Sequence, residues 1–198
     1  MNGLLSIVIA YLLGSIPFGY LLTRLSTGRD VRASGSGNIG ATNVLRTAGK
    51  ALGIATLGLD ILKGVAAVAL ADRLTRDPVW MALAALAVSA GHVFPVFLGF
   101  NGGKAVATFA GAFGYVLPFT LLATVVVFVI GVAVSKHISA GSILGAGTFP
   151  LGAWIIYHPS AVEMLAVIAA CALIIYRHRA NMERLRLGTE SVFHWSKS

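Results

Sequence analysis

Long runs of apolar residues fill most of this chain, and they constrain its fold more than any other feature. Of the 198 residues, 57% are hydrophobic and only 11% are charged, whereas a soluble domain carries about 25% charged residues. Such a chain has too few polar side chains to cover a surface that faces water. Because a transmembrane helix needs about 20 mainly apolar residues, the sequence predicts an all-α integral membrane protein.

The apolar runs predict a bundle of about seven transmembrane helices, which we expect to form one polytopic domain over residues 1–198. Gly14, Pro17 and Gly19 interrupt the first run, which predicts a kink there. The predicted spans cover 3–23, 51–71, 79–98, 105–116, 118–134, 142–157 and a last run ending near Tyr176. The fourth is short for a full crossing. Polar loops are predicted at 24–50, 72–78, 99–104 and 135–141.

Positive charges are distributed unevenly among these loops. With the amino terminus outside, the outer segments hold only Arg73 and Arg76, and the inner segments hold nearly all other Lys and Arg residues. The positive-inside rule therefore predicts an outer amino terminus and a cytoplasmic carboxyl terminus. The same rule explains the formal net charge of +8, so no nucleic-acid partner is expected. Every glycine-rich polar segment then falls on the cytoplasmic face.

The first of these segments, residues 34–46, reads Ser-Gly-Ser-Gly-Asn-Ile-Gly-Ala-Thr-Asn-Val-Leu-Arg. Glycines let successive backbone N–H groups form a concavity that favours an anion. Polar side chains add donors, and an arginine suits a forked grip on phosphate. A flexible linker is the alternative. The candidate phosphate-binding residues are Gly35, Ser36, Gly37, Asn38, Gly40, Thr42, Asn43 and Arg46.

The second glycine-rich segment ends in Gly102, Gly103 and Lys104. Two glycines before a helix expose backbone N–H groups, and the helix amino terminus adds partial positive charge. Lys104 supplies a point charge, so this segment is a second candidate phosphate site. A reverse turn with a lysine that reaches the membrane surface is the alternative.

The basic tail begins where the last span ends. His178 and Asn181 are three residues apart and share a face if the tail is helical. The alternative is an interfacial helix that binds anionic lipid head groups, which explains the arginines better than it explains Asn181.

Three polar residues lie inside predicted spans. Asp60 and Lys63 are costly in a bilayer, so either they serve function or they form an ion pair that packs their span. His92 is more often a hydrogen-bonded core residue than a catalyst in such a place. No His, Cys and carboxylate cluster has metal-ligand spacing, so neither a metal nor a cofactor is expected.

Three motifs together resemble a known family. They are Ser36-Gly37-Asn38-Ile39-Gly40-Ala41-Thr42-Asn43 with Arg46; Gly91-His92-Val93-Phe94-Pro95-Val96-Phe97 leading to Gly102-Gly103-Lys104; and Arg177-His178-Arg179 with Asn181, Arg184, Leu185 and Glu190. In order and over nearly the whole chain, they look like the cytoplasmic motifs of the PlsY family of bacterial acyl-phosphate:glycerol-3-phosphate acyltransferases. Ser142 resembles a site serine of that family. Asn101 stands where the family often has lysine, and Ala105 where it often has glycine.

The resemblance implies a seven-helix bundle in the bacterial inner membrane with its active site facing the cytosol. It implies transfer of a fatty acyl group from acyl phosphate to the 1-hydroxyl of glycerol 3-phosphate, giving lysophosphatidate and phosphate, with a substrate phosphate as the suggested base. The catalytic residues would be Ser36, Arg46, Lys104, His178 and Asn181. The competing hypotheses are a transporter of phosphorylated solutes, for which we would expect polar residues on both faces and an internal repeat, and a lipid-sensing structural protein.

Overall fold

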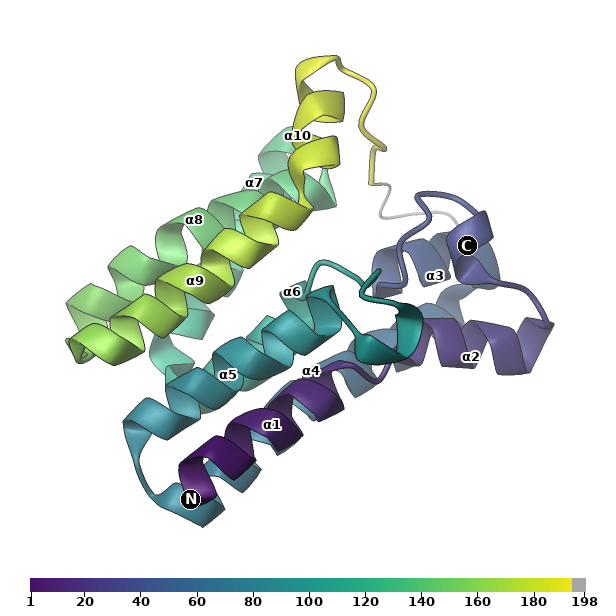
Figure 1. Ribbon diagram of the computed structural model, residues 1–198. Coiled ribbons are helices and arrows are strands. Elements are labelled where there is room, and N and C mark those ends of the chain that lie inside the picture. The colour runs from purple at the N-terminus through teal and green to yellow at the C-terminus, as the bar shows by residue number, and fades with distance from the viewer. Residues whose placement is uncertain (194–198) are drawn as a thin grey trace. The chain divides into compact units, whose positions relative to one another are not determined.

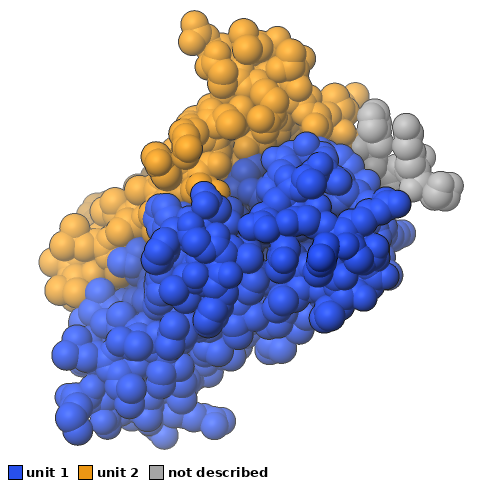
Figure 2. Space-filling model, turned by 45° about the vertical axis from the view of Figure 1, so that its right-hand side comes forward, with its two compact units in different colours: residues 1–116 blue, residues 117–198 orange. Residues whose placement is uncertain are grey.

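The computed structural model describes residues 1–193, and over that range it contains only helices and their connections (Figure 1). The helices form two compact units, residues 1–116 and residues 117–198 (Figure 2). Unit 1 contains α1 (Asn2–Gly14), α2 (Phe18–Thr27), η1 (Val31–Ala33), α3 (Ala41–Ala48), α4 (Lys50–Thr75), α5 (Pro78–Val93), η2 (Val96–Leu98) and α6 (Val106–Val116). Unit 2 contains α7 (Pro118–Ser135), α8 (Ile138–Tyr157), α9 (Ala161–Arg177) and α10 (Arg179–Arg186).

Small residues let the helices of unit 1 approach closely. Helix α4 packs against α1, α5 and α6, and α1 packs against α5. A Cβ atom on Gly64 would meet the backbone of Thr108, and one on Gly14 would meet the backbone of Val88. Close approach through small residues is how helices associate in a membrane, where lipid is as apolar as leucine. These crossings hold the helix ends, and the loops they carry, in fixed positions.

The first apolar run breaks between α1 and α2, as its glycines and proline predict. Helix α1 ends at Gly14, and α2 begins directly after Pro17. Proline has no N–H and restricts the residue before it, so the helical hydrogen-bond pattern stops here. The carbonyl of Ile16 accepts the Phe18 N–H at 3.2 Å and also accepts a hydrogen bond from the Lys63 ammonium of α4 at 2.9 Å.

The prediction of one polar loop over 24–50 is wrong in detail. Helix α2 continues to Thr27, and the segment also contains η1 and the eight-residue helix α3. Val31, Ile39 and Val44 form a small buried apolar cluster beneath the glycine-rich stretch. Val44 is the member of this cluster that lies in α3, where it is a buried apolar residue among polar neighbours.

Two other predicted loops are shorter than expected. Helix α4 continues to Thr75, where Arg76 ends it in the left-handed conformation, so the loop predicted at 72–78 shrinks to two residues. Helix α8 begins at Ile138 rather than Ser142, because Ser139 and Gly141 pack as helical residues against other parts of unit 2. Conversely, α5 ends at Val93, just before Phe94 and Pro95, and η2 follows.

Helix α8 is central in unit 2. It packs against α7, α9 and α10, and α10 turns away from α9 by 52°. The Ser160 side chain and the Glu163 carboxylate form a capping box at the start of α9. After α10 the chain folds back, and the Phe193 N–H donates to the Lys136 carbonyl at the α7–α8 turn.

Apolar side chains face outward along the long helices, as expected for contact with lipid. Within residues 1–193, five helical segments are long and apolar enough to cross a membrane: Asn2–Thr27, Lys50–Thr75, Pro78–Leu98, Pro118–Ser135 and Ile138–Tyr157. The bent pair α9 and α10 makes a sixth if it is one span, and α6 is a shorter apolar helix of 11 residues. The all-helical membrane fold is therefore confirmed, and the count of seven crossings and their orientation stay predictions.

Candidate functional site

Asn43 organises the first glycine-rich loop from within. Its side-chain amide donates to the backbone carbonyls of Val31, Ser34 and Asn38 at 3.2, 3.1 and 2.9 Å. Its side-chain oxygen accepts the Ser36 N–H at 2.9 Å. Because the side chain is 3% exposed and its donors and acceptor are used by the loop, Asn43 shapes the loop from beneath.

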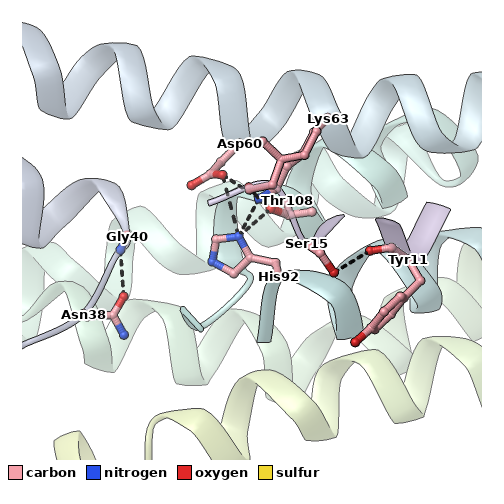
Figure 3. Close-up of polar contacts among 9 residues, drawn as sticks. Tyr11, Ser15, Asn38, Gly40, Asp60, Lys63, His92 and Thr108 are labelled. Atoms are coloured by element: carbon pink, nitrogen blue, oxygen red, sulfur yellow. Dashed lines mark hydrogen bonds and ion pairs between the residues drawn. The ribbon is translucent and has the colours of Figure 1, made fainter. Parts of the chain in front are cut away.

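Two positions in this loop require glycine. Gly35 and Gly37 have φ angles of +60° and +68°, which residues with a Cβ rarely adopt. A Cβ on Gly35 would also collide with the Asn43 side-chain oxygen. A further internal contact closes the loop, because the Gly40 N–H donates to the Asn38 side-chain oxygen at 2.8 Å (Figure 3). The glycine pattern therefore reflects tight turns around Asn43.

The other predicted residues of this loop present their side chains outward. Ser36, Thr42 and Arg46 are exposed, and Thr42 lies in the first turn of α3. The nearby acid Asp30 is engaged by Arg32, 2.7 Å away, whose hydrogen bonds hold the pKa of the Asp30 carboxyl below its usual value. This loop therefore offers two hydroxyls around the start of α3, where an anion is favoured, and an exposed guanidinium in the last turn of the same helix.

The second glycine-rich loop is built directly on His92. The Gly103 N–H donates to the His92 carbonyl at 3.0 Å, and the Gly102 N–H donates to the Val93 carbonyl at 3.1 Å. A Cβ on Gly103 would collide with the His92 ring. Lys104 follows and is partly buried, and Ala105 is buried with φ of +60°. The turn thus fixes the position of the Lys104 backbone relative to His92.

Beneath this loop lies a buried polar cluster that comprises Asp60, Lys63, His92 and Thr108 (Figure 3). The Lys63 ammonium lies 2.8 Å from the Asp60 carboxylate and 3.0 Å from His92 Nδ1. The Thr108 hydroxyl lies 3.2 Å from the same nitrogen. The sequence left Asp60 and Lys63 open between a functional role and an ion pair, and in the fold they form an ion pair that also contacts a histidine.

In unit 2, His178 and Asn181 lie at the start of α10, and both are buried. His178 Nδ1 donates to the Ile174 carbonyl at 2.8 Å, which places a proton on that nitrogen. The Asn181 amide donates to the Glu190 carboxylate at 2.6 Å. The predicted helix is present as α10, with His178 as its N-cap residue and Asn181 in its first turn.

Glu190 joins three side chains from two helices of unit 2. It accepts hydrogen bonds from Ser139 of α8 at 2.8 Å and from Asn181, and it pairs with Arg184 at 2.7 Å. Burial acts to raise the pKa of the Glu190 carboxyl, but these hydrogen bonds outweigh it and the pKa is lowered. Glu190 is therefore ionised, and its carboxylate holds the Asn181 side chain in position. Ser142 of α8 is 6% exposed, and its hydroxyl donates to the Ile138 carbonyl at 2.9 Å.

Two residues of these polar networks were not identified from the sequence. Thr108 is a single threonine in an apolar helix, which carries no signal of a partner. Ser139 was placed in a loop, and only its position in the second residue of α8 directs it toward Glu190. Among residues 1–193, no group of three His, Cys, Asp or Glu side chains is arranged to hold a metal ion.

The apolar helices define a multi-pass integral membrane protein, and its connecting segments supply glycine-rich turns beside cations. A sequence model of the Glycerol-3-phosphate acyltransferase family matches residues 4–188. The chain therefore belongs to this family of membrane acyltransferases of phospholipid biosynthesis.

Its relatives are similar over nearly their whole length. The Glycerol-3-phosphate acyltransferase of Geobacter sulfurreducens is 48% identical over 98% of both chains, and that of Clostridioides difficile is 43% identical over 92% of this chain and 91% of its own. A crystal structure of PlsY, an integral membrane glycerol 3-phosphate acyltransferase in its glycerol 3-phosphate form, matches with a TM-score of 0.92 and 38% identity over 98% of this chain and 96% of PlsY. The form with lysophosphatidic acid matches with a TM-score of 0.89 and 36% identity over the same shares.

Proposed function

We propose that this protein transfers a fatty acyl group from acyl phosphate to the 1-hydroxyl of glycerol 3-phosphate. A bond forms between the hydroxyl oxygen and the acyl carbon, and the bond between that carbon and the phosphate oxygen breaks. The hydroxyl proton passes to a phosphate. The products are 1-acylglycerol 3-phosphate and inorganic phosphate, and the reaction is the first acylation of phospholipid synthesis.

The observation that carries this proposal is the similarity to PlsY in its glycerol 3-phosphate form, which covers both units and all three polar motifs. The loops have the chemistry that such a reaction needs. Both substrates carry a phosphate, and each glycine-rich loop leads to a cation, Arg46 or Lys104, that can bind one. The sequence predicted exposed backbone N–H groups at Gly102 and Gly103, but these groups donate to the carbonyls of Val93 and His92, so the cations carry this part of the proposal. An acyl phosphate has a good leaving group, so alignment of the two substrates can supply about 7–11 kcal/mol of the barrier.

Each predicted residue has a proposed role. Ser36, the surrounding glycines and Arg46 bind one phosphate, and Asn38, Thr42 and Asn43 support or extend that loop. Lys104 binds the other phosphate, and the turn of Gly102 and Gly103 places it. His178, Asn181 and Ser142 position glycerol 3-phosphate in unit 2. A phosphate oxygen of a substrate serves as the base, in keeping with the family resemblance, because the one carboxylate beside the first loop, Asp30, is held by Arg32.

We place the protein in the bacterial inner membrane with its site facing the cytosol and its amino terminus outside. The basis is the positive-inside rule, which also puts all three polar motifs on one side. We further propose that the two units act together as one domain, since the family match runs across their boundary.

The test is an assay of the purified protein in detergent with acyl phosphate and glycerol 3-phosphate. Released phosphate is measured, and lysophosphatidate is identified by mass. A parallel reaction supplies acyl-CoA instead. We expect lysophosphatidate when acyl phosphate is the donor and none when acyl-CoA replaces it. Product with acyl-CoA alone would overturn the proposed donor, and uptake of labelled glycerol 3-phosphate into liposomes without acylation by either donor would favour a transporter.

A further inference from the structure

The buried polar cluster of Asp60, Lys63, His92 and Thr108 places charged side chains inside unit 1, where their desolvation is unfavourable. The side chains of the first three are 2–5% exposed, and they lie within segments long enough to span a membrane. Charged groups at such depth are disfavoured unless other groups pair with them. A cluster retained at this cost calls for a role that apolar packing would not provide.

Lys63 joins three structural elements through one ammonium group. Its Nζ atom lies 2.8 Å from the Asp60 carboxylate on its own helix α4, 2.9 Å from the Ile16 carbonyl and 3.0 Å from His92 Nδ1 of α5. The Ile16 carbonyl is available because the chain breaks between α1 and α2. An ammonium has three protons, and these three contacts match them in number.

The contact with Lys63 decides the protonation of His92. An ammonium only donates hydrogen bonds, so His92 Nδ1 must accept, and the proton of the neutral ring lies on Nε2. Asp60 is 3.6 Å from Nδ1, and Lys63 stands beside both groups as the cation that balances the carboxylate. Of the two charged groups that face the ring from α4, the Lys63 ammonium at 3.0 Å favours a bare Nδ1, whereas the Asp60 carboxylate at 3.6 Å would favour a proton there, and the shorter contact is the one with Lys63. Thr108 of α6 meets the same nitrogen without adding charge.

His92 in turn carries the second glycine-rich loop. Its carbonyl holds the Gly103 N–H, and Gly103 lies against its ring so closely that a Cβ atom would collide with Nε2. A rotation of the ring would therefore move the turn. Lys104, the predicted phosphate ligand, is the next residue, so a displacement of the His92 ring would also displace the Lys104 backbone.

We propose that Lys63 and Asp60 are positioning residues, which hold His92 in its Nε2–H tautomer and thereby place the turn of Gly102, Gly103 and Lys104 against a substrate phosphate. In this role the Lys63 ammonium binds groups of the protein, including His92, and does not bind a substrate. The kinetic part of this inference rests on the proposed acyl transfer, and the tautomer part does not.

The first test reads the tautomer without any enzyme assay. Protein labelled with ¹⁵N-histidine is studied by NMR in detergent from about pH 5 to about pH 9, and the His92 signals are assigned by their loss in His92→Asn. We expect a bare Nδ1 and a protonated Nε2 throughout this range. In Lys63→Met we expect His92 to titrate or to populate both tautomers. A wild-type ring protonated on Nδ1, or a Lys63→Met ring unchanged from wild type, would overturn the proposal.

The second test separates positioning from simple charge balance. Lys63→Met leaves a buried unpaired carboxylate and risks misfolding, so the informative variant is Asp60→Asn/Lys63→Met, which removes both charges. We expect this double variant to fold, to lose the fixed tautomer and to lower kcat/KM about 10- to 100-fold, the size of effect that a small misplacement produces. Wild-type kinetics in the double variant would mean that the pair only compensates its own charges, and would overturn the proposal.

Lys50→Met is the matched control, since it removes an exposed lysine from the first turn of the same helix. It should change neither the His92 signals nor the kinetics. The two proposals fail differently: if the wild-type protein forms no product from acyl phosphate while the NMR result holds, the proposed reaction is wrong and the assigned tautomer stands.

Discussion

The side-chain oxygen of Asn43, in the first turn of α3, accepts the backbone N–H of Ser36 at 2.9 Å. This bond joins a buried residue to the exposed residue that we predict to bind phosphate. The Asn43 amide holds three carbonyls of the same loop, so one side chain fixes both edges of the turn. The phosphate binding that we propose for this loop would therefore depend on a residue whose own side chain is used within the loop.

Asn43→Ala should weaken both the fold of the loop and catalysis. The substitution leaves several buried backbone groups without partners, for which we expect a loss of roughly 2 kcal/mol in the free energy of unfolding. Acyl transfer should fall at least tenfold, by the misplacement of Ser36. Thermal unfolding and the phosphate-release assay measure the two effects. Asn101→Ala, at an exposed asparagine with a local contact to Gly99, is the control, and equal losses in both variants would contradict this role.

Arg46→Ala and Lys104→Ala should each remove most of the activity while membrane insertion stays intact. Each cation is predicted to stabilise charge on a phosphate during the reaction, and loss of one such group typically costs about 10²- to 10³-fold in kcat. Neither side chain belongs to the buried core, so yields from detergent extraction should match the wild type. Arg29→Ala removes an exposed arginine of the same polar segment and should be active. Near-normal turnover in both site variants would refute the two phosphate sites.

His178→Ala should mainly raise the KM for glycerol 3-phosphate. Its Nδ1 proton is held by the Ile174 carbonyl, so the ring has one orientation, and its other nitrogen is the one we propose to meet the substrate. Initial rates over a range of glycerol 3-phosphate concentrations give the result. His158→Ala, at an exposed histidine, should leave KM as it is. An unchanged KM in His178→Ala would assign the histidine to the architecture of α10 alone.

Position 105 should accept glycine and reject β-branched residues. Ala105 is buried with φ of +60°, a conformation that costs about 1–3 kcal/mol for a residue with a Cβ and most for a branched one. We expect Ala105→Gly to remain active and to unfold within about 1 kcal/mol of the wild type, because relief of strain offsets the greater freedom of glycine in the unfolded chain. Ala105→Val should lose stability and, through displacement of Lys104, activity. Equal stability of the two variants would show that the turn relaxes freely.

The Glu190 network should make unit 2 sensitive to acid. The pKa of Glu190 is lowered from its ordinary value of 4.5, so its ionised form stabilises the fold fully above that value, and this contribution is lost as the pH falls through the lower folded pKa. The unfolding midpoint of the wild type should therefore drop more steeply below about pH 4.5 than that of Glu190→Gln, which keeps an acceptor without the charge. Parallel pH profiles for the two proteins would rule out this contribution.

The sequence by itself determined the membrane fold and the position of its polar motifs. Apolar runs long enough to cross a bilayer can be recognised one segment at a time, because transfer of each helix into lipid depends mainly on its own composition. The break at Pro17 followed for a similar reason, since proline interrupts a helix wherever it lies. The motifs around Ser36, Lys104 and His178 stood out as polar, glycine-rich or basic segments between such runs and led to the family.

Only the tertiary structure decided what those polar residues contact. Lys63 could have paired with Asp60 alone, but the break between α1 and α2 brings in the Ile16 carbonyl, and the packing of α5 brings in His92. Asn43 was predicted to face a ligand, and its side chain is held by its own loop instead. Hydrogen bonds between residues far apart in the chain depend on how helices cross, and that geometry is set by the whole fold.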